Sequence, residues 1–248
     1  MKKIIPLILL LAFFCLGNSS TDFDGTNDSV SYGTNTTLSD STVGSSIVVW
    51  FYCDTDHDGS FISDIHSDDQ GSILRCDAQG FFSSRQNVIT YSVDDGTLEQ
   101  LEGNTNSELP GNWQWASGTA SLDSPDEMRL YVDGVEQSDS PKSTDLVNMG
   151  LSNTEWRAGE QPSSGGVDLN GKLAYLQLWN RTLTYVEVVQ AAYCPGTVPE
   201  GLQMFDTMLE GSGTHLDLSG NGMTGTPNNN ATGSDFGPPG VLFCGGIL

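Results

Sequence analysis

The stretch from Glu127 to Glu136 constrains the fold of this chain more than any other part of its sequence. Leu130 and Val132 alternate with more polar neighbours, which is the period of a strand with one buried face. Asp133-Gly134 follows, and this pair favours a two-residue hairpin turn because both residues tolerate positive φ values. Val135 resumes the alternation on the return strand. The stretch therefore predicts an antiparallel β-hairpin.

Residues 1–20 have the organisation of a secretory signal peptide. Lys2 and Lys3 give a positive start, an apolar run extends from Ile4 to Leu16, and small residues follow. A membrane anchor is the alternative, although the run is short for a spanning helix. No later segment is apolar enough to cross a bilayer. We therefore expect a secreted, extracellular chain that does not insert into a membrane.

The charge balance narrows the range of partners. The chain has 9 Lys and Arg against 32 Asp and Glu. Loss of the two signal-peptide lysines leaves a net charge of 7 − 32, or −25. Such a chain repels nucleic acid and anionic lipid. Three explanations for the excess of negative charge stay open: solubility, life in saline surroundings, and neutralisation by divalent cations.

Short β-rich segments alternate with Gly, Asn and Asp turns, which is typical of a sandwich or barrel. The run from Ser46 to Cys53 is apolar and β-branched, so we expect a buried central strand there. Residues 94–111 are polar and are expected to form a loop. One short helix is expected after Thr184, an N-cap with Glu187 as its capping-box partner. The other expected strands are 59–65, 71–76, 80–82, 87–93, 112–116 and 172–179.

Four cysteines follow the signal peptide, and an even number in an exported chain indicates disulfides. Three pairings are possible. Cys53 and Cys76 lie on neighbouring expected strands, whereas Cys194 follows the helix and Cys244 lies in the C-terminal tail. We favour Cys53–Cys76 and Cys194–Cys244, because the second bond would tether the tail to the domain.

Four motifs occur in order between about residues 22 and 193. They are Phe23-Asp24-Gly25-Thr26-Asn27-Asp28, Gly111-Asn112-Trp113-Gln114-Trp115-Ala116, Arg129-Leu130-Tyr131-Val132-Asp133-Gly134, and Asn170-Gly171-Lys172 through Leu183. Together they resemble laminin-G-like jelly rolls of the concanavalin A-like superfamily, although that family more often has histidine where Gln114 and Trp115 stand. The resemblance implies an all-β fold: an antiparallel β-sandwich, or jelly roll, with one short helix near the C-terminal side. We place this domain at residues 21–195.

A further stretch, Leu209 to Gly222, resembles the opening of such domains but stands near the C-terminal end. It could add a strand to the same domain or begin a truncated repeat. We favour the added strand, and expect residues 196–248 to be an extension that packs on the domain and ends in the disulfide-tethered tail.

The superfamily includes glucanases, whose active strand resembles Glu-x-Asp-x-x-Glu. That spacing places two glutamates on one face, where they flank the sugar bond. The nearest pair here, Glu99 and Glu102, lies three residues apart in a polar stretch that would not raise the pKa of an acid. No serine stands in a nucleophile elbow. We therefore predict that the protein is not an enzyme.

The strongest chemical candidate is the acidic loop after the expected central strand. Asp54, Asp56 and Asp58 alternate before Gly59, and oxygen ligands in such a pattern suit calcium. The twelfth position of an EF-hand loop requires glutamate, and isoleucine stands there, with Asp64 one residue earlier. A solvated acidic turn is the alternative. The resemblance adds that laminin-G-like domains often hold calcium at the rim of the sandwich, so calcium on Asp54, Asp56, Asp58 and Asp64 is our hypothesis.

Exposed aromatic rings could stack on sugars. Trp50, Trp113 and Trp179 are expected in the core. Trp156 lies in a turn-rich stretch between two charged residues, and we select it as an exposed ring. Trp115 is the second candidate for ligand binding.

Two classes of function therefore stay open. The first is a secreted, non-enzymatic binding module for a carbohydrate or glycoprotein ligand, assisted by calcium. The second is a structural or adhesive component of an extracellular or virion surface, without a sugar site.

Overall fold

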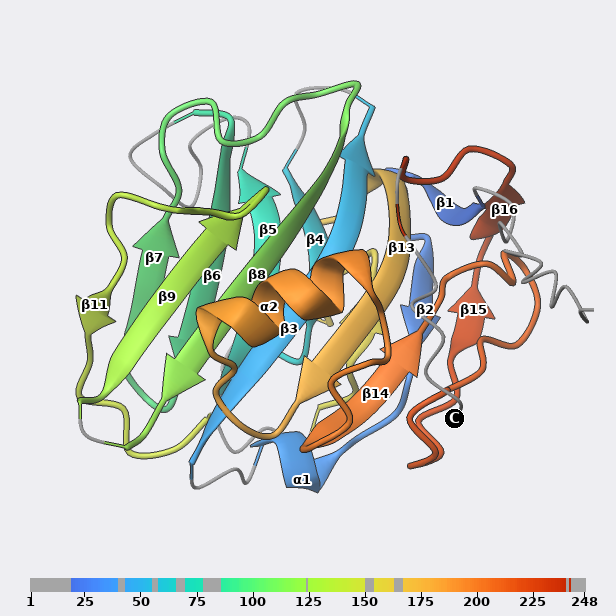
Figure 1. The fold of residues 1–248 in the computed structure, drawn as a ribbon. Coiled ribbons are helices and arrows are strands. Elements are labelled where there is room, and N and C mark those ends of the chain that lie inside the picture. Colours follow the sequence, from blue (N-terminus) through green and yellow to red (C-terminus); the bar gives the residue numbers. More distant parts are fainter. Residues whose placement is uncertain are drawn as a thin grey trace, which may run out of the picture.

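Two antiparallel sheets pack face to face and form a β-sandwich (Figure 1), as the sequence predicts. The computed structural model describes residues 19–39, 43–54, 58–65, 70–77, 86–123, 125–149, 154–162, 167–239 and 241. Two helices occur within these ranges, the single turn α1 (Thr36–Ser39) and α2 (Tyr185–Tyr193). The predicted signal peptide lies outside the described residues, as does the expected strand at 80–82. No helix in the described part is long and apolar enough to span a membrane.

The first sheet has nine strands within the described residues and contains the hairpin. Its order is β10 (Val135–Glu136), β9 (Glu127–Val132), β8 (Trp113–Ser121), β3 (Gly44–Cys53), β13 (Asn170–Trp179), β1 (Ser20–Asp24) and β16 (Thr232–Ser234). Two further strands pair beside this path, β11 (Lys142–Ser143) with β9 and β14 (Leu202–Asp206) with β13. The predicted central strand, β3, lies in the middle of the order between β8 and β13.

The second sheet has seven strands in the described part of the chain. Its order is β15 (Thr226–Asn228), β2 (Ser29–Ser31), β12 (Arg157–Ala158), β4 (Gly59–Ser63), β5 (Gly71–Asp77), β6 (Val88–Asp94) and β7 (Leu98–Glu102). Strand β7 lies in the polar stretch that we expected to be a loop. Its polar side chains are tolerated because β7 is an edge strand, with only Leu101 fully buried.

The hairpin prediction is confirmed. Val132 pairs with Val135 across the turn, and the φ angles of Asp133 and Gly134 are 49° and 81°. These values are the left-handed conformation that the turn requires. The Asp133 carboxylate also accepts a hydrogen bond from the backbone N–H of Trp115 at 2.9 Å, which ties the turn to the neighbouring strand β8.

The main core lies between the two sheets. Leu130 and Val132 from β9 are buried in it with Leu176 and Leu178 from β13, as their alternation predicts. Burial of these side chains, at roughly 1.5–3 kcal/mol each, drives the packing of the sheets.

A second core lies on the outer face of the nine-stranded sheet, beneath α2, which crosses the front of that sheet in Figure 1. The indole N–H of Trp50 donates to the carbonyl of Ala192 in α2 at 2.7 Å. Trp179 donates in the same way to Val198, just beyond the helix, at 2.9 Å. These bonds satisfy the polar edges of two buried rings, and both tryptophans belong to the core, as predicted.

The C-terminal segment adds strands to both sheets. Strand β14 pairs with β13, β16 with β1, and β15 with β2. Strand β13 has a bulge at Tyr175, where the φ angle is 51° and the ladder of hydrogen bonds with β3 is interrupted. The Tyr175 N–H donates instead to Thr207, just after β14.

Candidate functional site

Five side chains form a row across the nine-stranded sheet, on the face that carries α2. Directly opposed pairs define it: Trp113 with Tyr52, Tyr52 with Lys172, Lys172 with Asp22, and Asp22 with Thr232. Opposed residues of neighbouring strands point to the same face. Because α2 covers Trp50 and Trp115 further along the strands, the row lies at the end of the face that the helix leaves open. Its members are half-buried or exposed.

At one end of the row, three aromatic rings lie together, and two of them, Trp113 and Phe236, line a hollow. The ring centroids of Tyr52 and Trp113 are 5.7 Å apart, and Phe236 lies 5.3 Å and 6.0 Å from them. We call these three rings the aromatic cluster. The hollow beside it has a volume of about 400 Å³ and is also lined by Asn112 and Pro239. Phe236 is half exposed, so part of the cluster faces solvent.

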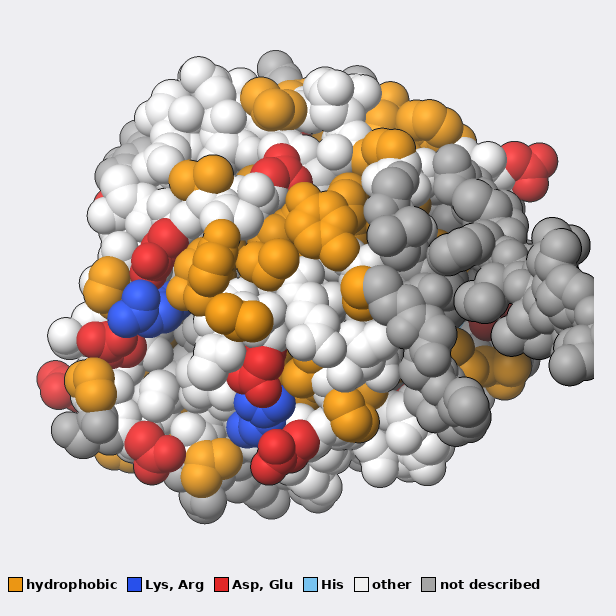
Figure 2. Space-filling view, in the orientation of Figure 1, with side chains coloured by type: hydrophobic (Ala, Val, Ile, Leu, Met, Phe, Trp, Pro, Cys, Tyr) orange, Lys and Arg blue, Asp and Glu red, His pale blue; other side chains and the backbone are white. Residues whose placement is uncertain are grey.

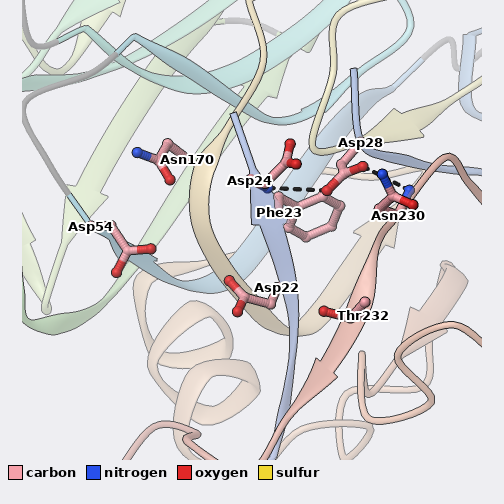
Figure 3. Close-up of a pocket in the computed structure, with 8 residues that line it drawn as sticks. All are labelled: Asp22, Phe23, Asp24, Asp28, Asp54, Asn170, Asn230 and Thr232. Atoms are coloured by element: carbon pink, nitrogen blue, oxygen red, sulfur yellow. Dashed lines mark hydrogen bonds between the residues drawn. The ribbon is translucent and has the colours of Figure 1, made fainter. Parts of the chain in front are cut away.

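At the other end of the row lies an acidic pocket of about 420 Å³ (Figure 3). It is lined by Asp22, Phe23, Asp24, Asp28, Asp54, Asn170, Asn230 and Thr232. The buried carboxylate of Asp28 accepts backbone N–H bonds from Asp24 and Asn230, at 3.1 and 2.8 Å, and so joins β1 to the C-terminal segment. The pocket therefore presents carboxylate and amide oxygens, the ligand types that calcium prefers.

Lys172 links the two ends of the row. Its ammonium lies 3.2 Å from Asp22 and 3.4 Å from Asp54, and 5.2 Å from the centroid of the Tyr52 ring. Two carboxylates thus share one cation, and the surroundings keep an excess of negative charge. A ligand with its own carboxylate would meet repulsion here.

Figure 2 shows the same face as a surface, with hydrophobic side chains gathered in its middle around α2. Among the exposed ones are Tyr185, Val186 and Tyr193 of the helix. The buried residues of α2 are Val188, Ala191 and Ala192, on the side that faces the sheet.

The four acidic residues chosen from the sequence have different fates. Asp54 lines the acidic pocket, whereas Asp56 lies outside the described residues. Asp58 precedes β4 and interacts electrostatically with Arg75 of the seven-stranded sheet. Asp64 is buried beyond the far end of β4, where it accepts the Ser72 N–H at 2.7 Å. Since the five residues of β4 lie between Asp58 and Asp64 and separate them by roughly 20 Å, the assignment of Asp64 to the same ion was wrong.

Both tryptophans selected as ligand-binding rings are buried. Trp115 is 0% exposed beneath α2, with the Tyr193 ring 6.1 Å away, and Trp156 is 4% exposed in the main core. Trp156 points inward because its neighbours Glu155 and Arg157 form an ion pair on the outer side. The charged residues on either side of Trp156 therefore indicate side chains that alternate in an extended segment leading into β12, rather than an exposed loop. The ring that faces the open end is Trp113, which we had expected in the core.

Cys53 and Cys76 meet across the sandwich, one on each sheet, with their sulfur atoms 3.5 Å apart. The structure has them as two thiols, and the disulfide between them stays a prediction. Their mutual hydrogen bond and burial raise the pKa of Cys53, and burial raises that of Cys76. Both shifts favour the protonated thiols while the protein is folded. Cys194 is disulfide-bonded, but its predicted partner Cys244 lies outside the described residues, so that pairing stays a prediction.

Sequence reasoning missed most of the row. Tyr52 lies between two buried residues of β3. Because side chains alternate along a strand, this position alone would have predicted that Tyr52 lies on the outer face. Lys172 belongs to a motif that we had used only to identify the fold. Asp22 and Phe236 carried no signal, because their neighbours in the site come from distant parts of the chain.

Two solved structures show the same type of fold at low sequence identity, and a third is more weakly similar. One, a candidate carbohydrate-binding protein from Bacteroides ovatus, has a TM-score of 0.68 and 15% identity; the match covers 89% of this chain and 60% of that one. Another is the CBM40 module of the Ruminococcus gnavus IT-sialidase with bound α2,3-sialyllactose. It has a TM-score of 0.54 and 12% identity, and the match covers 71% of this chain and 99% of that one. Domains LG4-5 of mouse laminin α1 have a TM-score of 0.49 and 13% identity, and the match covers 69% of this chain and 45% of that one.

The family comparison extends over most of the sandwich. The family model Laminin_G_3, described as the concanavalin A-like lectin/glucanases superfamily, matches residues 24–189, more than half of the 248 residues. The comparison with curated proteins found no match. The matched region includes the hairpin, the central strand and the start of α2. The chain therefore belongs to the laminin-G-like family of the concanavalin A-like superfamily.

Proposed function

We propose that this protein is a secreted, non-enzymatic carbohydrate-binding module that holds a glycan against the aromatic cluster. The observation that carries the proposal is the hollow lined by Trp113 and Phe236, with Tyr52 in contact with both rings. Exposed aromatic faces pack on the apolar faces of sugar rings, and a few convergent polar groups then orient the ligand. Asn112 at the rim and Lys172 beside Tyr52 supply such groups.

The electrostatics favour an uncharged glycan over an acidic one. Asp235 lines the aromatic hollow, and Asp22 and Asp54 flank Lys172. The CBM40 module with the same fold is described with bound sialyllactose, an acidic sugar. In this chain a sugar carboxylate would meet carboxylates, so we expect neutral hexoses or N-acetylhexosamines to bind more tightly than sialosides.

Binding rather than hydrolysis is the activity that the acidic residues support. Glu99 lies on the edge strand β7, where Lys142 pairs with it at 2.7 Å. A carboxylate that is paired with a lysine at the edge of a sheet lacks the apolar surroundings of a glycosidase acid.

A glycan-array screen tests the proposal, with Trp113→Ala and Phe236→Ala as site variants. We expect each to lower the affinity for the best neutral glycan at least about tenfold, or 1.4 kcal/mol. Tyr185→Ala is the matched control, because it removes an exposed aromatic ring of α2 away from the aromatic cluster. Thermal melts confirm that each variant is folded. If no glycan binds, or if the site variants bind like the control, the structural or adhesive alternative takes precedence.

We further propose that calcium assists this function from the acidic pocket, with Asp54 among its ligands. Its support is the oxygen-rich lining with four carboxylates, of which Asp22 and Asp54 share the ammonium of Lys172. At 100 times its dissociation constant, calcium that binds only the folded state stabilises it by about 2.7 kcal/mol. We expect calcium to raise the melting temperature over that in EDTA, and Asp22→Asn/Asp54→Asn to abolish the rise. An unchanged melting temperature in the unaltered protein would exclude the site.

Secretion is proposed from the sequence of residues 1–20. Expression in a secreting host followed by intact-mass measurement tests it. Export with cleavage between Gly17 and Thr21 is expected, whereas retention of the full N-terminus in a membrane fraction would favour an anchor.

A further inference from the structure

The C-terminal segment buries a histidine between two carboxylates, away from the aromatic cluster and the acidic pocket. His215 and Asp206 are fully buried, and the His215 Nδ1 atom lies 2.9 Å from Asp206 Oδ2. The Glu210 carboxylate is 3.9 Å from the same nitrogen. One donor atom from each of the three residues fits within 4.8 Å of the others.

The orientation of the imidazole is fixed from its other side. His215 Nε2 lies 2.9 Å from the carbonyl oxygen of Gly211 and donates its N–H to it. A histidine that binds a metal commonly makes this bond, because a carbonyl acceptor on one nitrogen leaves the other nitrogen to the ion. Here the nitrogen that remains is Nδ1, which faces the two carboxylates.

A fourth polar atom comes from another part of the chain. The Tyr32 hydroxyl, just after β2, donates to Asp206 Oδ2 at 2.6 Å. Asp206 Oδ1 accepts the N–H of Met208 at 2.6 Å, which fixes the carboxylate in place. The Glu210 side chain is 25% exposed, so this member of the group is accessible from solvent.

We propose that His215 Nδ1, Asp206 Oδ2 and Glu210 Oε2 bind a zinc ion, with the Tyr32 hydroxyl or a water molecule as the fourth ligand. Zinc bonds of 2.0–2.2 Å place tetrahedral ligands about 3.3–3.5 Å apart. In the structure His215 Nδ1 lies 2.9 Å from Asp206 Oδ2, which is shorter than that distance, and 3.9 Å from Glu210 Oε2, which is longer. Asp206 would move outward and Glu210 inward, each by about half an ångström.

Charge and donor type select the ion. A neutral imidazole with two carboxylates carries two negative charges, which one divalent cation neutralises. The imidazole nitrogen favours zinc over calcium, which prefers oxygen ligands. The ion would join the segment after β14 to the residue after β2, and so attach the C-terminal strands to the sandwich.

The experiment uses the full chain, stripped with chelator and then saturated with calcium so that the acidic pocket does not compete. Zinc chloride is titrated by calorimetry, and cobalt chloride is followed in the visible spectrum. Glu210→Gln removes a ligand at a partly exposed position, and Glu200→Gln is the matched control at an exposed glutamate. His215→Asn is a second site variant, used where its melt shows a folded protein.

We expect the unaltered protein and Glu200→Gln to bind a single zinc ion per chain and to give the intense cobalt bands of a tetrahedral site. Glu210→Gln should bind zinc more than about 100-fold more weakly, since loss of a supporting partner alone costs 10–100-fold. Equal zinc affinity in Glu210→Gln and Glu200→Gln would overturn the proposal, as would weak octahedral cobalt bands in the unaltered protein. Glycan binding does not enter these measurements, so the outcome is independent of the proposed function.

Discussion

Gly118 on β8 faces the ring of Tyr91 across the sandwich. A Cβ atom at this position would lie 2.3 Å from the ring, much closer than carbon atoms approach in proteins. Tyr91 is itself fully buried and pairs with Leu101 and Leu74 on its neighbouring strands, so it has little room to move. The absence of a side chain at residue 118 therefore sets the local distance between the sheets.

We predict that Gly118→Ala lowers the free energy of unfolding by about 1–3 kcal/mol, the usual cost of overpacking a core. Chemical denaturation measures this. Gly233→Ala on β16 is the control, because its nearest neighbour would be at an ordinary 3.6 Å, and it should change stability by less than about 0.5 kcal/mol. Equal effects at both positions would show that the contact with Tyr91 is not limiting.

Helix α2 begins with the capping box that the sequence predicts. Thr184 accepts the N–H of Glu187, and the Glu187 carboxylate accepts the N–H of Thr184 at 2.9 Å. The Arg181 guanidinium, 2.7 Å away, and the Thr184 N–H lower the pKa of Glu187 to about 2. A carboxyl with a lowered folded pKa stabilises the protein above its unfolded pKa, and that stabilisation is lost as the pH falls.

Glu187→Gln keeps the shape of the cap but removes its charge. We predict that it lowers stability at pH 7 by less than about 1 kcal/mol, since the pair with Arg181 is near the surface. The difference from the unaltered protein should shrink between about pH 4.5 and 2. Denaturation at a series of pH values measures it, with Glu200→Gln as the exposed control. A difference that persists unchanged at pH 2 would contradict the assignment.

Strands β3 and β5 belong to different sheets, and Cys53 and Cys76 bring them into contact. Because the sulfur atoms lie 3.5 Å apart, a disulfide could join the sheets with little movement. We predict that refolding in a glutathione redox buffer closes this bond and raises the free energy of unfolding by about 3 kcal/mol. Peptide mapping without reductant checks the pairing, and Cys76→Ser serves as the control. Two free thiols after refolding would show that the buried dithiol is the stable form.

The segment that follows the family match supplies strands to both sheets of the sandwich. The match ends at residue 189, yet β14, β15 and β16 complete both sheets, and Phe205 is buried in the second core. A chain without this segment would leave strand edges of β13, β1 and β2 without their neighbours.

We predict that a chain of residues 19–195 fails to fold cooperatively. Thermal and denaturant melts followed by near-ultraviolet circular dichroism measure this, with the chain of residues 19–248 as the control. A cooperative transition in the shorter chain would show that residues 196–248 are an accessory rather than part of the domain.

Local patterns in the sequence predicted several parts of the fold. The hairpin, the buried strand β3 and the cap of α2 each depend on residues close together in the sequence, and all three are present. Alternation also assigned Leu130 and Leu176 to the shared core, because side chains two apart on a strand point to the same face.

The location of the candidate site depended on the tertiary structure. Trp113 and Trp115 share one face of β8, and the sequence does not show that α2 covers Trp115 and leaves Trp113 open. Likewise, His215 meets Tyr32 through Asp206, and Asp54 meets Asp22 through Lys172. Residues so far apart in sequence become neighbours only through strand register and sheet packing, which no local pattern contains.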